Sequence, residues 1–341
     1  MQKNSIKKHF NIIFLIVVFT LTIWSVFHGE DFGETLDYLQ SVNPVYVLLS
    51  IACVILFILG ESVLIHYMLK SLGTRVRLGH CCLYSFIGFF YSCITPSASG
   101  GQPMQVIAMR KDRIPVAVST VVLAIITITY KLVLVVIGLA VVIVRPPVLM
   151  AYIDNVEALI WLGLVLNVGC IILLLLLVFH PKLVKNCAEK LLKLVNRIHP
   201  FRHSEKLSAK LDSMAAQYTG TAEYYRTHHR TIVIVFLITL LQRCLLFLVT
   251  WLTYKAFGLS GESLVTILLM QAMISVAVDM LPLPGGMGIS ENLFLRMFLP
   301  VFGAELVLPG MVVSRGISYY TQLLLSAAVT VAASFIIRKK D

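Results

Sequence analysis

The sequence has few charged residues for its length. Charged side chains make up 13% of its 341 residues and hydrophobic side chains 58%, whereas soluble domains average about 25% charged residues. Several apolar stretches exceed the roughly 20 residues that a helix needs to cross a bilayer. The two-residue alternation of a transmembrane barrel is missing as well. These features exclude an ordinary soluble domain and predict an all-α polytopic membrane protein.

Signatures of common catalytic sites are also missing. The sequence contains no Walker loop, no GxSxG, no HExxH and no Cys/His cluster. Its seven cysteines lie in or beside apolar segments without metal-ligand spacing, and we interpret them as reduced, small hydrophobic residues. We therefore expect no cofactor, no metal and no catalytic residue, and a transporter more than an enzyme.

Positive charge is concentrated beside the apolar stretches. The net charge of +11 comes from 28 Lys and Arg residues against 17 acidic ones. Most of the basic residues fall on one side of the membrane if both termini are cytoplasmic, as the positive-inside rule requires. This placement argues against a nucleic-acid partner and predicts a multi-pass protein of the cell (plasma) membrane with both termini in the cytoplasm.

Six apolar stretches predict full membrane spans. The first has a basic flank and no convincing cleavage site after it, which indicates a retained span and not a signal peptide. Between the fourth and fifth stretches, segment 180–230 carries ten Lys or Arg residues against four acidic ones. It predicts a cytoplasmic amphipathic linker that contacts anionic lipid headgroups. The predicted spans lie at about 10–28, 45–69, 115–144, 158–179, 231–254 and 307–337.

Two further apolar segments are interrupted by helix-breaking residues. Residues 95–103 read TPSASGGQP, and residues 281–291 read LPLPGGMGISE. Proline and glycine disfavour a continuous helix, and non-helical backbone at membrane depth is tolerated only where it is buried in protein or lines a cavity. We predict two broken re-entrant hairpins, or pairs of spans, at 80–113 and 262–302, whose breaks face each other.

The order of spans and breaks occurs twice within what we interpret as a single membrane domain, residues 1–341. A shift of 185 residues places Lys70 on Lys255 and Lys111 on Arg296, and it aligns the Gly-Gly pairs of the two breaks. The first pseudo-repeat, 10–144, has an odd number of full crossings, so the second, 158–337, is predicted to be inverted. Inverted repeats with discontinuous helices are typical of transporters, which bind substrate at the repeat interface.

Charged residues inside the apolar stretches are candidate binding groups. An uncompensated charge at the bilayer centre costs at least about 2.5–3.5 kcal/mol. Positive residues outnumber acidic ones here, so a bound phosphate would help to balance them. Helix starts after the Gly-Gly pairs add N–H donors, and serine and glutamine side chains add neutral hydrogen bonds. The predicted substrate-binding residues are Ser97, Ser99, Gly100, Gly101, Gln102, Lys131, Arg243, Asp279, Gly285, Gly286, Gly288, Glu291, Arg296 and Arg315.

Structural roles compete with binding at several of these positions. Glu61, Lys131 and Arg243 could form internal ion pairs that only fix helix packing. Glu291, three residues after Gly288, could cap the start of its own helix. The glycines could serve close helix packing alone.

At its two breaks the sequence resembles a known family. TPSASGGQP, with a basic helix end after it, and PLPGGMGISE look like the flippase-like transmembrane domain of lysylphosphatidylglycerol synthases and their stand-alone relatives. The resemblance covers about 10–337 and implies a domain that moves charged phospholipids, such as aminoacylated phosphatidylglycerol, between leaflets. The full synthases add a large soluble aminoacyltransferase domain that this sequence does not contain, so we do not expect synthase activity. By resemblance, the implicated residues are Pro96, Gly100, Gly101, Pro103, Pro284, Gly285, Gly286, Gly288 and Glu291.

The sequence therefore predicts a flippase or scramblase. Its substrate would be a membrane phospholipid or a lipid-linked phosphate, including a polyprenyl-linked lipid. One alternative is an integral-membrane enzyme or accessory subunit that acts on lipid-linked substrates, and another is a non-catalytic scaffold. An enzyme leaves a covalently changed lipid, whereas a transporter does not. A homo-oligomer is compatible with each of these functions.

Overall fold

The chain folds into a bundle of membrane-spanning helices. The structure is a computed structural model and describes residues 38, 40, 42–153, 156–179 and 218–338. These residues contain helices and no strand, which confirms the all-α polytopic fold. The predicted span at 10–28 and most of the linker 180–230 lie outside them. Five helical segments are long and apolar enough to cross a membrane: α3 (Pro44–Ser71), α6 (Val116–Val144), α8 (Glu157–Phe179), α11 (His229–Ala256) and the run Val307–Ala333.

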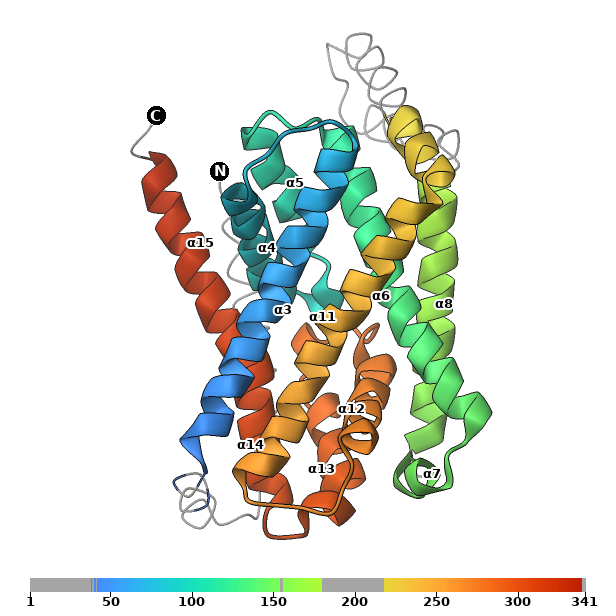
Figure 1. Ribbon diagram of the computed structural model, residues 1–341, viewed down its shortest axis with the longest axis vertical. Coiled ribbons are helices and arrows are strands. Elements are labelled where there is room, and N and C mark those ends of the chain that lie inside the picture. The colour runs from blue at the N-terminus through green and yellow to red at the C-terminus, as the bar shows by residue number, and fades with distance from the viewer. Residues whose placement is uncertain (1–37, 39, 41, 154–155, 180–217, 339–341) are drawn as a thin grey trace, which may run out of the picture.

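Helices α3 and α11 form a closely packed pair. Each has 28 residues, and their bounds differ by the offset of 185 found in the sequence. They lie side by side and run in opposite directions (Figure 1). The Gln242 side chain on α11 donates a hydrogen bond to the backbone carbonyl of Phe57 on α3 at 2.8 Å. An inverted repeat requires this antiparallel arrangement, and the inverted repeat itself stays a prediction.

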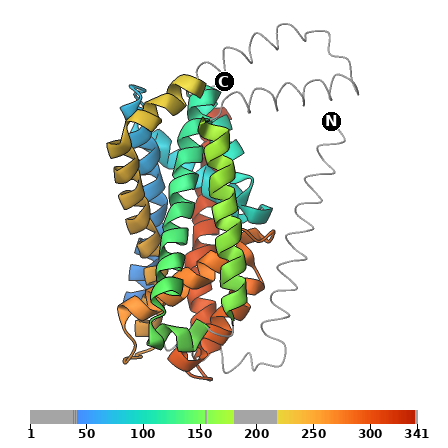
Figure 2. The same ribbon diagram turned by 90° about the vertical axis from the view of Figure 1, so that its right-hand side faces the viewer.

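Both predicted breaks occur, and each separates the two arms of a helical hairpin. The first hairpin occupies the upper half of the bundle in Figures 1 and 2, and the second occupies the lower half. The short 3-10 turns at the two breaks contact each other between the hairpins. The first hairpin consists of α4 (Leu78–Cys93), η1 (Pro96–Ala98) and α5 (Gly101–Lys111), and the second of α12 (Leu264–Val278), η3 (Pro284–Gly286) and α13 (Ile289–Phe302).

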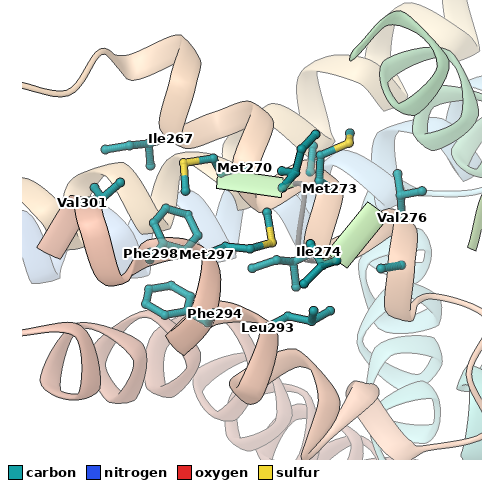
Figure 3. Packing of buried hydrophobic residues seen from close by; sticks show 14 of the residues in the cluster. Ile267, Met270, Met273, Ile274, Val276, Leu293, Phe294, Met297, Phe298 and Val301 are labelled. Atoms are coloured by element: carbon teal, nitrogen blue, oxygen red, sulfur yellow. The ribbon is translucent and has the colours of Figure 1, made fainter. Parts of the chain in front are cut away.

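The arms of the second hairpin are held together by a tightly packed apolar core. Met270 of α12 lies beside the Phe298 ring of α13 in Figure 3, and Met273 belongs to the same buried cluster. The rings of Phe294 and Phe298 are stacked, with centroids 4.4 Å apart. Because lipid is itself apolar, such packing and not the hydrophobic effect holds helices together within a membrane. It fixes the position of the second break relative to α12.

Two elements differ from the predicted spans. The connection after α6 contains a short helix, α7 (Pro147–Ile153). The last predicted span is divided into α14 (Val307–Arg315), a π-helical segment η4 (Gly316–Thr321) and α15 (Gln322–Arg338). A π-helical turn widens the helix and changes the direction of the side chains that follow. Here it lies between Arg315 and Gln322, beside the second break.

Candidate functional site

A cavity of about 470 Å³ lies where the two breaks meet. Both hairpins line it, together with residues of α3, α6, α11 and the π-helical segment. Ser97 in the first break donates a hydrogen bond to the carbonyl of Leu281 in the second at 3.1 Å. The Tyr319 hydroxyl donates to the carbonyl of Cys93, at the end of α4, at 2.8 Å. The two halves of the chain therefore contact each other at the cavity.

The structure brings most of the predicted binding residues to this cavity. Gly100, Gly101 and Glu291 lie next to it without lining it, and Gly288 and Arg296 line a different groove. The substrate-binding role of these residues stays a prediction. The predicted residues that line the cavity are Ser97, Ser99, Gln102, Lys131, Arg243, Asp279, Gly285, Gly286 and Arg315.

Lys131 and Asp279 form an ion pair between the two halves. The Lys131 Nζ lies 2.7 Å from Asp279 Oδ2, and the side chains are 8% and 14% exposed. Asp279 follows the last residue of α12, where the helix dipole disfavours a carboxylate. The Lys131 ammonium offsets this effect, and the Tyr130 hydroxyl donates a further hydrogen bond to Asp279. The pair thus fixes α6 to the second break.

Arg315 and Glu291 form a second ion pair beside the cavity. Arg315 Nε lies 2.9 Å from Glu291 Oε1, and Arg315 Nη2 donates to the carbonyl of Gly285 at 2.9 Å. The other carboxylate oxygen of Glu291 accepts hydrogen bonds from the Gly288 N–H and the Ser290 hydroxyl, both at 2.8 Å. Glu291 therefore does cap the start of α13, which was the structural alternative, and it is 3% exposed.

Arg243 is the cavity cation with the fewest polar contacts. Its guanidinium lies 3.5 Å from the centre of the Tyr130 ring and 5.0 Å from that of Phe57. Such cation–π contacts stabilise a desolvated arginine. Its Nε is buried without a hydrogen-bond partner, and no ion pair to Arg243 forms among the residues that the structure describes. Glu61 acts on it electrostatically but accepts its hydrogen bond from Gln105, at 2.5 Å. Arg243 thus keeps donors for a ligand.

The charges at the cavity balance. The expected excess of positive charge is not found, because Arg296 lies elsewhere. Three cations lie at or beside the cavity together with three carboxylates, so the site is not purely cationic, and among the described residues Arg243 has no ion-pair partner. The six residues are Lys131, Arg243, Arg315, Glu61, Asp279 and Glu291.

Two glycines of the breaks are required by close packing. A Cβ on Gly101 would lie 2.1 Å from the Ser92 hydroxyl oxygen and 2.7 Å from the backbone carbonyl oxygen of Gly88. A Cβ on Gly285 would lie 2.0 Å from the Tyr319 ring, and the φ of Gly285 is +58°. Packing alone therefore explains these two glycines, whether or not they also contact a substrate.

Sequence reasoning missed several uncharged polar residues of the cavity. Tyr130 contacts both Arg243 and Asp279, and Gln105 is the hydrogen-bond donor to Glu61. The available signals were weak: Tyr130 is adjacent to Lys131, and Gln105 lies one helical turn after Gln102. No group of three or more His, Cys, Asp or Glu residues in the described ranges could hold a metal ion.

A comparison with protein-family models identifies the family of the chain. The model for the lysylphosphatidylglycerol synthase TM region matches residues 12–326. The chain belongs to this family. The match confirms the resemblance that the two break motifs indicated, and it relates the chain to membrane lipids. No curated protein matches the chain at a significant level.

Proposed function

We propose that this family member moves a phosphate-bearing lipid between the two leaflets, and that the lipid headgroup passes through the central cavity. The observation that carries the proposal is that two broken hairpins, one from each half, enclose a charged cavity bridged by the Lys131–Asp279 ion pair. Discontinuous helices that meet between two halves of a chain are the transporter arrangement. The proposal includes a cell-membrane location, cytoplasmic termini, an inverted repeat and the absence of catalysis.

The cavity suits a headgroup and not a whole lipid. Its volume of about 470 Å³ lies within the range of sites for small ligands, so the acyl chains would stay in the bilayer. Arg243 has donors without protein partners, and arginine binds phosphate through parallel hydrogen bonds. The phosphate would bind at Arg243, and an ammonium or hydroxyl of the headgroup would contact Glu61 or Asp279.

Transport requires the cavity to open to either side in turn. The hydrogen bonds of Ser97 with Leu281 and of Tyr319 with Cys93 connect the two halves beside the cavity and would have to change as the halves move. In the proposed cycle, a bound headgroup replaces the Lys131–Asp279 pairing, and the halves then rock against each other. A ligand shifts this equilibrium only by binding one state more tightly than the other.

The experiment is lipid movement in proteoliposomes of the purified protein. Labelled phosphatidylglycerol, an aminoacylated version, a polyprenyl phosphate and a neutral lipid are compared by quenching of the outer leaflet. Single substitutions at a buried ion pair cost about 3–5 kcal/mol because they leave one charge unpaired, whereas replacing both partners by apolar residues is often neutral. The variant is therefore the double substitution Lys131→Met, Asp279→Leu, with Lys111→Met, at an exposed position, as control.

We expect protein-dependent movement of at least one phosphate-bearing lipid, lost in the folded double variant and kept in the Lys111→Met control. Movement that is equal in the double variant would contradict the assignment of the cavity. No movement of any lipid, with or without an ion gradient, would favour the enzyme or accessory alternative. A covalently altered lipid, detected by mass spectrometry, would then decide for the enzyme.

A further inference from the structure

A second hollow, which we name the lateral groove, lies between the start of α8 and α13. Its volume is about 430 Å³. One side consists of apolar residues before and within the first turn of α8, and the other is the first half of α13. The lining residues from α13 and its N-cap are Gly288, Ile289, Asn292, Leu293 and Arg296.

The second break separates the lateral groove from the central cavity. Gly285 and Gly286 line the cavity, whereas Gly288, two residues later, lines the groove. Glu291, on the intervening turn of α13, is directed to Arg315 and is 3% exposed, so it does not enter the groove. The two hollows are therefore neighbours on opposite sides of one short backbone segment.

Arg296 gives the lateral groove a positive charge. Its side chain is exposed, no acidic residue lines the groove, and no ion pair to Arg296 forms within the described ranges. Arg296 lies eight residues after Gly288, about 12 Å along the helix at 1.5 Å per residue. An arginine exposed on a helix within the membrane requires an anion or water, and its long side chain reaches towards the interface.

The groove also presents a second polar donor next to the arginine. Asn292 lies one helical turn before Arg296, is exposed and lines the same hollow. The Asn292 amide can donate a hydrogen bond to an anion oxygen that the Arg296 guanidinium would bind as well. The remaining lining is apolar, and Leu299, the next α13 residue towards the helix end on this side, is 46% exposed. The groove thus offers a binding position for one anionic oxygen group next to apolar surface. A phospholipid has this combination, because its phosphate lies next to its acyl chains.

We infer that the lateral groove is a phospholipid-binding site separate from the central cavity, with Arg296 binding the lipid phosphate and Asn292 assisting. The acyl chains would lie along the exposed apolar surface of α13. The site does not require transport, although its position across the second break from the cavity suits a lipid that enters or leaves there. The ligand class is a membrane phosphodiester lipid.

The test is photolabelling of the purified protein in maltoside micelles, which contain no phosphate. The probe is phosphatidylglycerol with a photoactivatable acyl chain, and the matched probe is the diacylglycerol with the same chains. Labelled peptides are located by mass spectrometry. The variants are Arg296→Ala, Arg296→Lys and Asn292→Trp, which fills the groove from an exposed position. Arg77→Ala removes an exposed arginine at the opposite end of the bundle and serves as control.

We expect the phosphatidylglycerol probe to label the α13 peptide about tenfold more than the diacylglycerol probe does, as a charged hydrogen bond allows. Arg296→Ala and Asn292→Trp should reduce labelling to the diacylglycerol level, while Arg296→Lys and Arg77→Ala keep most of it. Equal labelling by both probes, unchanged labelling in Arg296→Ala, or an unlabelled groove that another part of the chain covers would overturn the inference. Full displacement by inorganic phosphate would assign the site to free phosphate instead.

Failure here is distinguishable from failure of transport. The lateral groove is tested by binding at α13, whereas the proposed function is tested by lipid movement and by the Lys131→Met, Asp279→Leu variant. Lipid movement with an unlabelled groove would leave the central cavity in place and remove only the second site.

Discussion

At the scale of single residues, Glu291 connects three parts of the second hairpin. Its two carboxylate oxygens accept hydrogen bonds from Arg315 Nε, from the Gly288 N–H and from the Ser290 hydroxyl. One side chain thus joins the break, the first turn of α13 and the end of α14. Because Glu291 is 3% exposed, bulk water has little access to replace these contacts.

Replacement of Glu291 by alanine should therefore destabilise the protein strongly. The substitution leaves the Arg315 guanidinium buried without its acid, which costs about 3–5 kcal/mol. Thermal unfolding in detergent, followed by exposure of buried cysteines to a fluorogenic maleimide, measures the effect. Glu223→Ala is the control, because the Glu223–Arg226 pair is exposed and such pairs contribute about 0–1 kcal/mol. An equal melting temperature for both variants would show that the Glu291 contacts do not matter.

At the scale of elements, the sequence predicts the helix bounds better than the helix faces. The breaks could be located because their prolines and glycines cannot continue a helix at membrane depth. Arg296 was predicted to bind substrate with the cavity residues, but it lines the lateral groove. An apolar sequence does not show which helix face contacts protein and which contacts lipid. Tyr130 was missed because an aromatic residue in an apolar run gives no signal of its contacts. The π-helical segment likewise could not be located, because Gly316 is its first residue and the Pro309–Gly310 pair before it lies within the regular helix α14.

The second break and the turns after α3 and α11 use left-handed glycines in different surroundings. Gly285 and Gly258 have φ values of +58° and +74°, but only Gly285 faces the Tyr319 ring, since a Cβ on Gly258 would meet nothing within 4 Å. An alanine at either position incurs the left-handed backbone cost of about 1–2 kcal/mol. The difference in stability between the two alanine variants therefore measures how much the packing of Gly285 against Tyr319 contributes.

We expect Gly285→Ala to lower the melting temperature more than Gly258→Ala does, and only Gly285→Ala to slow lipid movement. The additional cost should be about 1–3 kcal/mol, as for overpacked cores. Both variants are compared with the parent by thermal unfolding and by the proteoliposome assay. If the two substitutions have the same effect on both readouts, the Tyr319 contact carries no constraint.

At the scale of the whole molecule, the turns after α3 and α11 correspond in the way that the predicted inverted repeat requires. Gly73 after α3 and Gly258 after α11 have nearly equal φ values, +76° and +74°, and differ by the same offset of 185 residues. Figure 1 places these two turns at opposite ends of the bundle. The sequence predicted an inverted repeat from the parity of crossings and from the residues that align at this offset, and the repeat stays a prediction.

Single cysteines near these turns should accordingly react from opposite sides of the membrane. Gly79→Cys and Ser260→Cys introduce thiols at exposed positions beside the two turns. With a membrane-impermeant maleimide, the first should be labelled only from the cytoplasm and the second only from outside intact cells. Labelling of the unmodified protein gives the background from native cysteines. Reaction of both positions from the same side would exclude the inverted repeat.

The Lys131–Asp279 pair has a consequence for how the protein is made. The lysine precedes its aspartate by 148 residues along the chain. At a synthesis rate of about 5–20 residues per second, Lys131 waits about 7–30 seconds for its partner. During that interval its ammonium must be stabilised by water, by lipid phosphate or by the insertion machinery. The cavity is thus completed late, and the first half depends on a temporary counter-charge until the second arrives.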